Sequence, residues 1–242
     1  MSAGGSVAIP WAGYGTGTDS QRIQAACDYL ENNSGYAFRP GTANSLDPDV
    51  LEMNVRALVE LEEKYHVGNK NSPSRREVRV VNSGGYIAAC YSQSSQDIEL
   101  NAKYFGNKRK LESTEADSAI PRSYYGNMPW HFINSGASQK TLMTYSVTHE
   151  YGHALQGKMW NKAMFSGQTS QSFSQYAASC KRKIMSIAKK KYGNGPGANE
   201  NLSGYARKNS KEFFAEAFAG YNTGYVNPIT QAMGDWLAEQ GY

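Results

Sequence analysis

The spacing of hydrophobic residues predicts helices in the first part of the chain. Intervals of three and four positions indicate a helix over residues 18–33. Its apolar face is formed by Ile23, Ala26, Cys27 and Leu30. A second helix begins at Asp47 and Pro48, because proline suits the first turn, and ends near Gly68. Residues 1–17, before the first helix, are rich in glycine, and we expect them to be flexible.

The periodicity then changes to the alternation that is typical of strands. Residues 77–82 and 86–91 are separated by Ser-Gly-Gly, and this pattern predicts two paired strands. Residues 97–102 alternate with Ile98 and Leu100 on one face, and predict a third strand. We expect a small, twisted and mainly antiparallel sheet. Prolines and aromatic residues interrupt the pattern afterwards, so a long loop is predicted before the next helix.

The second half of the chain is predicted to be helical. Helices are expected over residues 138–160, 171–192, 210–221 and 228–239. This order of elements indicates an α+β fold with two lobes. The first lobe, residues 18–157, contains the sheet, and the second, residues 158–242, is helical. We expect a cleft between the two lobes.

Composition places the chain among folded, soluble proteins. Its 242 residues, of which 40% are hydrophobic and 19% charged, suit one well-buried domain. The net charge of +4 is too weak to predict nucleic-acid binding, and we expect none. No apolar stretch is long enough to predict a membrane span, and the start lacks a standard secretion signal. We therefore expect a protein that is cytoplasmic as made and that is packaged or exported, if at all, by a non-standard route.

Three cysteines, Cys27, Cys90 and Cys180, are widely separated and form no Cys-x-x-Cys pair. A disulfide framework and a cysteine-ligated zinc site are therefore both unexpected. We interpret all three residues as buried thiols.

The stretch THEYGHAL, residues 148–155, contains the candidate chemistry. His149 and His153 are four positions apart, so on a helix both imidazoles project from one face and can bind one metal ion. Glu150 points away from that face, but it can reach a water molecule bound to the ion. This is the HExxH pattern of zinc hydrolases, in which the glutamate is a general base. A chance match and a pair of surface histidines are the alternatives.

A catalytic zinc site normally has a third protein ligand. The best candidate lies in KEFFAEAFAGY, residues 211–221, where Glu212 and Glu216 are the two charged residues of an otherwise apolar helix interior. Two carboxylates one turn apart repel each other, and a metal ion with its histidines would relieve the repulsion. Glu212 would then bind the metal, and Glu216 would accept a hydrogen bond from a ligand histidine.

Other assignments are open at this point. His66 and His131 are alternative third ligands. The glutamate assigned as third ligand also fits a capping box with Asn209, which needs no metal. Glu216 would then need a cationic partner, and Arg207 is near in sequence.

These segments resemble the catalytic domain of anthrax lethal factor and its relatives, a family of gluzincin metallopeptidases with a zincin fold. The matching stretches are THEYGHAL and GYARKNSKEFFAEAFAGY, in which a tyrosine precedes a ligand glutamate by seven positions. The resemblance implies that His149, His153 and Glu212 bind Zn2+. It also implies that Glu150 is the general base and that the hydroxyl of Tyr205 donates a hydrogen bond to the oxyanion.

The resemblance further implies a protein or peptide substrate. In zincin folds an edge strand lines the cleft and binds substrate backbone by strand addition. The third predicted strand precedes the histidine helix, and its candidate residues are Ile98, Glu99, Leu100 and Asn101. An ordinary core strand is the alternative. His131 either contacts substrate or supports the local structure of its loop.

The leading hypothesis is a zinc-dependent metalloendopeptidase that cleaves peptide bonds in a protein substrate. Zinc would lower the pKa of a bound water molecule, and Glu150 would take its proton. The EFFAEAF segment also resembles one in minor head and morphogenesis proteins of phages and mobile elements. The alternative is therefore a catalytically silent zincin-fold structural or binding protein of a phage or mobile element. A phage or secretion-system component is the corresponding expectation for its assembly.

Overall fold

The computed structural model describes residues 11–39, 46–68, 76–82, 88–123, 128–134, 136–193 and 203–242. These residues form eight α-helices, one short 3-10 helix and a four-stranded sheet, which confirms the α+β class. The helices are α1 (Asp19–Asn33), α2 (Pro48–Tyr65), α3 (Ala102–Phe105), α4 (Lys108–Ser118), α5 (Gln139–Phe165), α6 (Phe173–Tyr192), α7 (Ser210–Asn222) and α8 (Pro228–Glu239). The strands are β1 (Tyr36–Arg39), β2 (Arg76–Val81), β3 (Ala89–Ser92) and β4 (Asp97–Asn101), and the 3-10 helix η4 spans Tyr205–Arg207.

The sheet is mixed, with the strand order β1-β2-β4-β3. β2 pairs in parallel with β1 and β4, whereas β3 pairs antiparallel with β4. The expectation of a mainly antiparallel sheet is therefore wrong. The predicted pairing of residues 77–82 with 86–91 is also wrong, because β4 lies between β2 and β3. Residues 83–87, which include the expected turn, lie outside the described residues.

Hydrophobic patterning missed one strand and two helices. β1 has four residues, too few for alternation to stand out. α3 and α4 occupy part of the long loop that was expected after the third strand. The buried residues of α4 are Leu111 and Glu115, so this helix has no apolar stripe for a periodicity argument to detect. Its start is fixed by Asn107, whose side chain accepts a hydrogen bond from the backbone N–H of Lys110.

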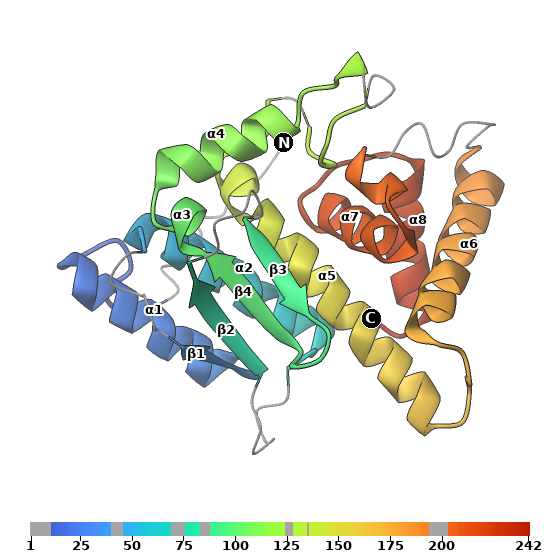
Figure 1. Ribbon diagram of the computed structural model, residues 1–242, viewed down its shortest axis with the longest axis horizontal. Coiled ribbons are helices and arrows are strands. Elements are labelled where there is room, and N and C mark those ends of the chain that lie inside the picture. Colours follow the sequence, from blue (N-terminus) through green and yellow to red (C-terminus); the bar gives the residue numbers. More distant parts are fainter. Residues whose placement is uncertain are drawn as a thin grey trace, which may run out of the picture.

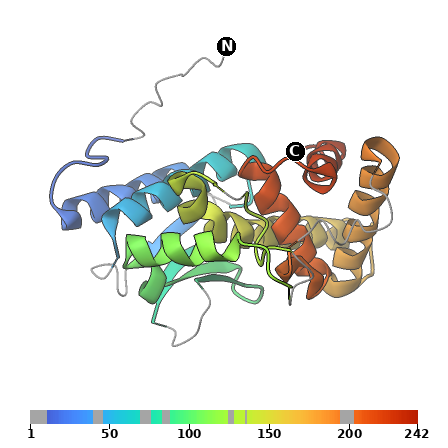
Figure 2. The same cartoon turned by 90° about the horizontal axis from the view of Figure 1, so that it is seen from above.

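Helices cover one face of the sheet and continue beyond it as a helical second half (Figure 1). α1 packs on α2 and β1, and α5 packs on β3 and β4; Figure 2 shows these helices to one side of the strands. α7 packs against α5, and α6 and α8 complete the group at the right of Figure 1. One continuous apolar core runs through both halves, and the predicted boundary between residues 157 and 158 falls inside α5.

The first two helices begin where the sequence predicts. Thr18 caps α1 through a capping box, and Asp47 caps α2 ahead of a proline in the first turn. Of the segment that was expected to be flexible, residues 1–10 lie outside the described residues, while the ring centroid of Trp11 is 4.5 Å from that of Tyr29. In the part of the chain that the structure describes, no helix combines the length and the apolar character needed to cross a membrane.

Candidate metal centre

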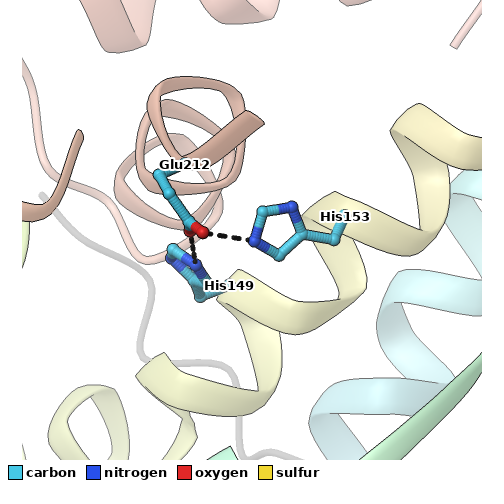
Figure 3. A group of neighbouring side chains, drawn as sticks. All are labelled: His149, His153 and Glu212. Carbon is cyan, nitrogen blue, oxygen red and sulfur yellow. Dashed lines mark hydrogen bonds and ion pairs between the residues drawn. The ribbon is translucent and has the colours of Figure 1, made fainter. Parts of the chain in front are cut away.

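α5 carries His149, Glu150 and His153 through the middle of the molecule, where most of its residues are buried. The helix begins after Ser138, whose hydroxyl accepts a hydrogen bond from the backbone N–H of Thr141. It is enclosed by α2, α4 and α7 together with β3 and β4. The two histidines project toward α7, with ring centroids 4.9 Å apart (Figure 3). Helical spacing therefore places both imidazoles on one face, as the sequence predicts.

A close approach of α7 to α5 brings the acidic residues to the histidines. Gly152 lies at the contact, where a Cβ atom would be 3.0 Å from Phe218 Cδ1 and 3.1 Å from Ala215 Cα. Helix packing thus accounts for this glycine, which is less favourable than alanine in a helix by about 1 kcal/mol. The contact leaves Glu212 and Glu216, one turn apart on α7, facing the histidine side of α5.

Three donor atoms converge on one point between the two helices (Figure 3). His149 Nε2 is 3.1 Å and His153 Nε2 is 3.0 Å from the same atom, Glu212 Oε2. Atoms bonded at about 2.0 Å to a tetrahedral ion are about 3.3 Å apart, so this spacing fits one metal ion. Two imidazoles and one carboxylate also form a ligand set of catalytic zinc, which leaves a position for water. Among the described residues, no other group of donors with this spacing occurs.

Glu216 is completely buried and orients the first of these histidines. Its Oε1 is 2.8 Å from His149 Nδ1 and 3.1 Å from His131 Nδ1. Its Oε2 accepts hydrogen bonds from the backbone N–H of Phe132 and from the hydroxyl of Ser203. With a proton on Nδ1, His149 directs the lone pair of Nε2 to the shared point. Glu216 therefore contacts the ring nitrogen of a histidine, as its position in the sequence predicts.

The protonation states of these groups depend on one another. Burial acts to raise the pKa of Glu212, but hydrogen bonds from His149 and His153 outweigh it and lower the pKa well below its usual range. Burial acts in the same way on Glu216, whose pKa is lowered by the charge of His131 and by hydrogen bonds from His131 and His149. Burial acts to lower the pKa of His149, yet its hydrogen bonds to the two glutamates raise it well above 6.5. Both glutamates are therefore ionised at neutral pH, the form that binds a metal or a protonated histidine.

Glu150 lies beside the donor atoms in a cleft. Two cavities, of about 290 and 180 Å³, share Glu150, Tyr205 and Ala89 as lining residues. Burial raises the pKa of Glu150, and the charges of the neighbouring histidines act in the opposite direction. A carboxylate with a raised pKa is a better proton acceptor. The ring centroid of Tyr205 is 5.4 Å from that of His149, so the tyrosine lies near the centre as well.

The predicted substrate strand is not at the edge of the sheet. β4 is paired on both sides, and Ile98 and Leu100 are buried in the core, so the expectation of an edge strand at residues 98–101 is wrong. Glu99 accepts a hydrogen bond from the Cys90 thiol, and Asn101 is the N-cap of α3. Alternation identifies a strand but does not show which neighbours it has.

β3 takes the edge position beside the cleft. Its residues Ala89, Cys90 and Tyr91 line the smaller cavity together with Glu150. The ring of Tyr91 stacks on that of His153, with centroids 6.4 Å apart. Cys90 is half-buried, so the prediction of three buried thiols holds for the other two cysteines only.

The remaining candidates divide between the centre and other roles. His131 lines the larger cavity and bonds to Glu216, and it is not one of the three converging donors. His66 is an exposed residue that caps the end of α2. Asn209 caps α7 with its own side chain, whereas the side chain of Glu212 contacts the two histidines. Capping therefore does not account for the side-chain contacts of Glu212. The partners of Glu216 are two histidines and not Arg207, the cation that is near in sequence.

Several cleft residues were missed in the sequence. They are Ala88, Ala89, Thr114, Glu115, Ser118, Trp130, Ser146 and Lys208. Ser146 lies on the same helix face as His149, three positions earlier, and this spacing is the signal that could have identified it. Glu115 gave no such signal, because α4 was not predicted. Burial raises the pKa of Glu115, and the charge of His131 acts against this rise.

Comparison with protein-family models, with curated proteins and with solved structures gave no match. The interpretation of the site therefore depends on the chain's own geometry. Its basis is the set of three converging donors, the buried glutamate behind them and the glutamate in the adjoining cleft.

Proposed function

We propose that this protein is a zinc-dependent metalloendopeptidase that hydrolyses peptide bonds in a protein substrate. The observation that supports this most strongly is the convergence of His149, His153 and Glu212 on one point beside Glu150. A structural zinc site is normally closed by four protein ligands, whereas three ligands next to a cleft leave room for water and substrate. The family resemblance of the two sequence motifs suggests the same class of enzyme.

The residues at and beside the centre have distinct roles in this proposed reaction. Zinc bound by the three donors would polarise the substrate carbonyl and lower the pKa of a bound water molecule. Glu150 accepts the proton of the attacking water and passes it to the leaving nitrogen. Tyr205 donates a hydrogen bond to the carbonyl oxygen as negative charge develops there. Glu216 keeps the ring of His149 in the orientation that metal binding requires.

The substrate backbone is proposed to lie along β3. This strand has one free edge in the described sheet, and its residues Ala89 and Cys90 line the cleft next to Glu150. An extended peptide can add to such an edge through main-chain hydrogen bonds. This assignment replaces residues 98–101 as the substrate strand.

Metal content tests the first half of the proposal. Purified wild type should retain one zinc per chain after dialysis, measured by inductively coupled plasma mass spectrometry. Glu212→Ala should retain markedly less, because one of three ligands is removed. His66→Ala is a matched control, since that exposed histidine is not one of the converging donors. Absence of zinc from the supplemented wild type would contradict the site.

Cleavage of unfolded casein tests the second half. Glu150→Gln should retain zinc and lose about 10²–10⁴-fold in rate, the usual contribution of a general base. Full activity in this variant would exclude Glu150 as the base. Zinc binding without any cleavage, together with stable co-purification of a capsid or secretion component, would favour the alternative of a silent zincin-fold binding protein.

A further inference from the structure

The larger cavity of the cleft, about 290 Å³, extends from the metal centre toward the start of α5. It is lined near the centre by His149, Glu150 and Tyr205. Further in, Ser146 lies on α5 one turn before His149, a displacement of roughly 5 Å along the helix. A substrate residue whose backbone lies at the proposed reaction site can therefore place its side chain in this cavity.

A buried carboxylate borders this cavity. Glu115 is 1% exposed, and one of its oxygens, Oε1, accepts a hydrogen bond from the hydroxyl of Ser146. The other oxygen, Oε2, has no hydrogen-bond partner among the described residues. His131 Nε2 is the nearest cationic group, but at 4.0 Å it is too far for a hydrogen bond. A buried acceptor without a donor is costly, so a ligand that supplies a donor would be stabilised here.

We propose that this cavity is a substrate subsite that selects a lysine or arginine side chain next to the scissile bond, with Glu115 as its acceptor. The inference rests on the proposed peptidase function, because it assigns the side-chain preference of that same site. The charged end of lysine or arginine would supply the Glu115 carboxylate with both a hydrogen-bond donor and an opposite charge. A neutral amide would bring the donor alone.

The walls of the cavity suit a long and narrow side chain. Ala88, Ala89 and Ser118 are small residues that leave space open, and Trp130 provides an aromatic surface. The methylene groups of lysine or arginine can pack on such a surface while the charged end reaches a polar partner. An aliphatic side chain would fill the same space but would leave the carboxylate without a donor.

Two cationic side chains of the protein, Lys208 and His131, already lie at the cavity. The ammonium of Lys208 lies 4.1 Å from the ring centroid of Tyr205 and 5.3 Å from that of Trp130, so aromatic faces hold it at the cavity lining. The ring of His131 is committed through Nδ1 to Glu216. If the charge of His131 alone compensates Glu115, the cavity will not distinguish lysine from an uncharged side chain of the same length.

A binding experiment that needs no cleavage tests the subsite. Zinc-loaded protein is titrated with Nα-acetyl-lysine amide and with Nα-acetyl-norleucine amide, and binding is followed by NMR. The lysine compound should bind at least about tenfold more tightly, the ratio expected from one charge-assisted hydrogen bond. Resonances of Ala88, Glu115 and Ser146 should shift. Equal affinities in the wild type would overturn the proposal without the use of any variant.

Two variants test whether Glu115 is the acceptor that causes the preference for lysine. Glu115→Gln should lose the lysine preference, because the amide has no negative charge. Glu112→Gln is the matched control, since Glu112 is one turn earlier on α4 and accepts a hydrogen bond from Gln139 at the surface. The control should keep the wild-type ratio. A lysine preference that survives in folded Glu115→Gln would overturn the assignment.

Digestion of unfolded casein separates the two proposals. If the protein cleaves, mass spectrometry should show lysine or arginine next to the cut bonds, and Glu115→Gln should reduce that enrichment about tenfold. Cleavage without such enrichment would overturn the subsite and leave the peptidase function standing. If no cleavage occurs, the peptidase function fails, and the titration still decides whether the cavity prefers a cationic side chain.

Discussion

Glu216 and Glu115 are both buried carboxylates beside the same centre, but their surroundings differ. Both oxygens of Glu216 are bonded, to two histidines, a backbone N–H and a serine hydroxyl. Glu115 lines a cavity and has one donor, Ser146, while its second oxygen is buried without a hydrogen-bond partner among the described residues. The comparison shows that burial alone does not assign a role to an acidic residue. A fully bonded carboxylate positions the protein's own groups, and a partly bonded one retains capacity for a ligand.

The same substitution at both sites should separate these roles, with the larger effect at Glu216. Glu216→Gln leaves two histidines without their charge partner and brings an amide N–H against existing donors. Breaking a buried charged network typically costs about 3–5 kcal/mol, and we expect a loss of this size in urea unfolding. Zinc affinity should also fall about 10–100-fold, because His149 loses its orienting partner. Unchanged zinc affinity in a folded Glu216→Gln protein would contradict the orienting role.

The helix contact that delivers Glu216 to the centre can be broken without touching an acidic residue. Gly152→Ala places a Cβ atom against Ala215 and Phe218, which α7 can accommodate only by shifting. Overpacking of this kind costs about 1–3 kcal/mol, more than the gain in helix propensity of about 1 kcal/mol. The variant should unfold at lower urea concentration and bind zinc less tightly.

Gly157→Ala, five residues later on the same helix, is the control for this variant. A Cβ there meets the hydroxyl end of Tyr91 at 3.1 Å, a side-chain atom that can move. Equal destabilisation by the two substitutions would show that the contact at Gly152 has no special importance.

The pH dependence of the metal-free protein should show the coupling around Glu216. The pKa of Glu216 is lowered from 4.5 on folding, so its contribution to stability is complete above pH 4.5 and is lost as the pH falls below it. The pKa of His149 is raised from 6.5, so its contribution is complete below pH 6.5 and is lost as the pH rises through the folded-state value. Stability measured by urea unfolding with a chelator present should therefore be greatest between these values. Glu216→Gln should flatten the acid side of the profile.

The smallest effect is expected at the other carboxylate. Glu115→Gln keeps an acceptor for the hydroxyl of Ser146. It removes the negative charge of a carboxylate whose second oxygen has no hydrogen-bond donor. Folding raises the pKa of Glu115, so its contribution to stability is present below pH 4.5 and is lost as the pH rises. The variant should therefore stay within about 1 kcal/mol of the wild type at pH 7, or exceed it. A loss as large as that of Glu216→Gln would mean that Glu115 is a structural residue.

The sequence alone determined the parts of this protein that depend on local spacing. Positions four apart on one helix share a face, so HExxH gives the relation of His149 to His153 before any fold is known. Two glutamates one turn apart in an apolar helix likewise indicate that both face the same partner. The starts of α1 and α2 follow from single capping residues for the same reason.

Only the tertiary structure decided which segments meet. A parallel neighbour is reached by a crossover and not by a tight turn, so alternation did not show that β4 is central or that β3 is the edge strand. Glu115 reaches the cleft because α4, which lacks an apolar stripe, packs against α5. Its partner Ser146 is 31 residues away in sequence. Contacts of this kind are made by packing between elements, and no periodicity within one element records them.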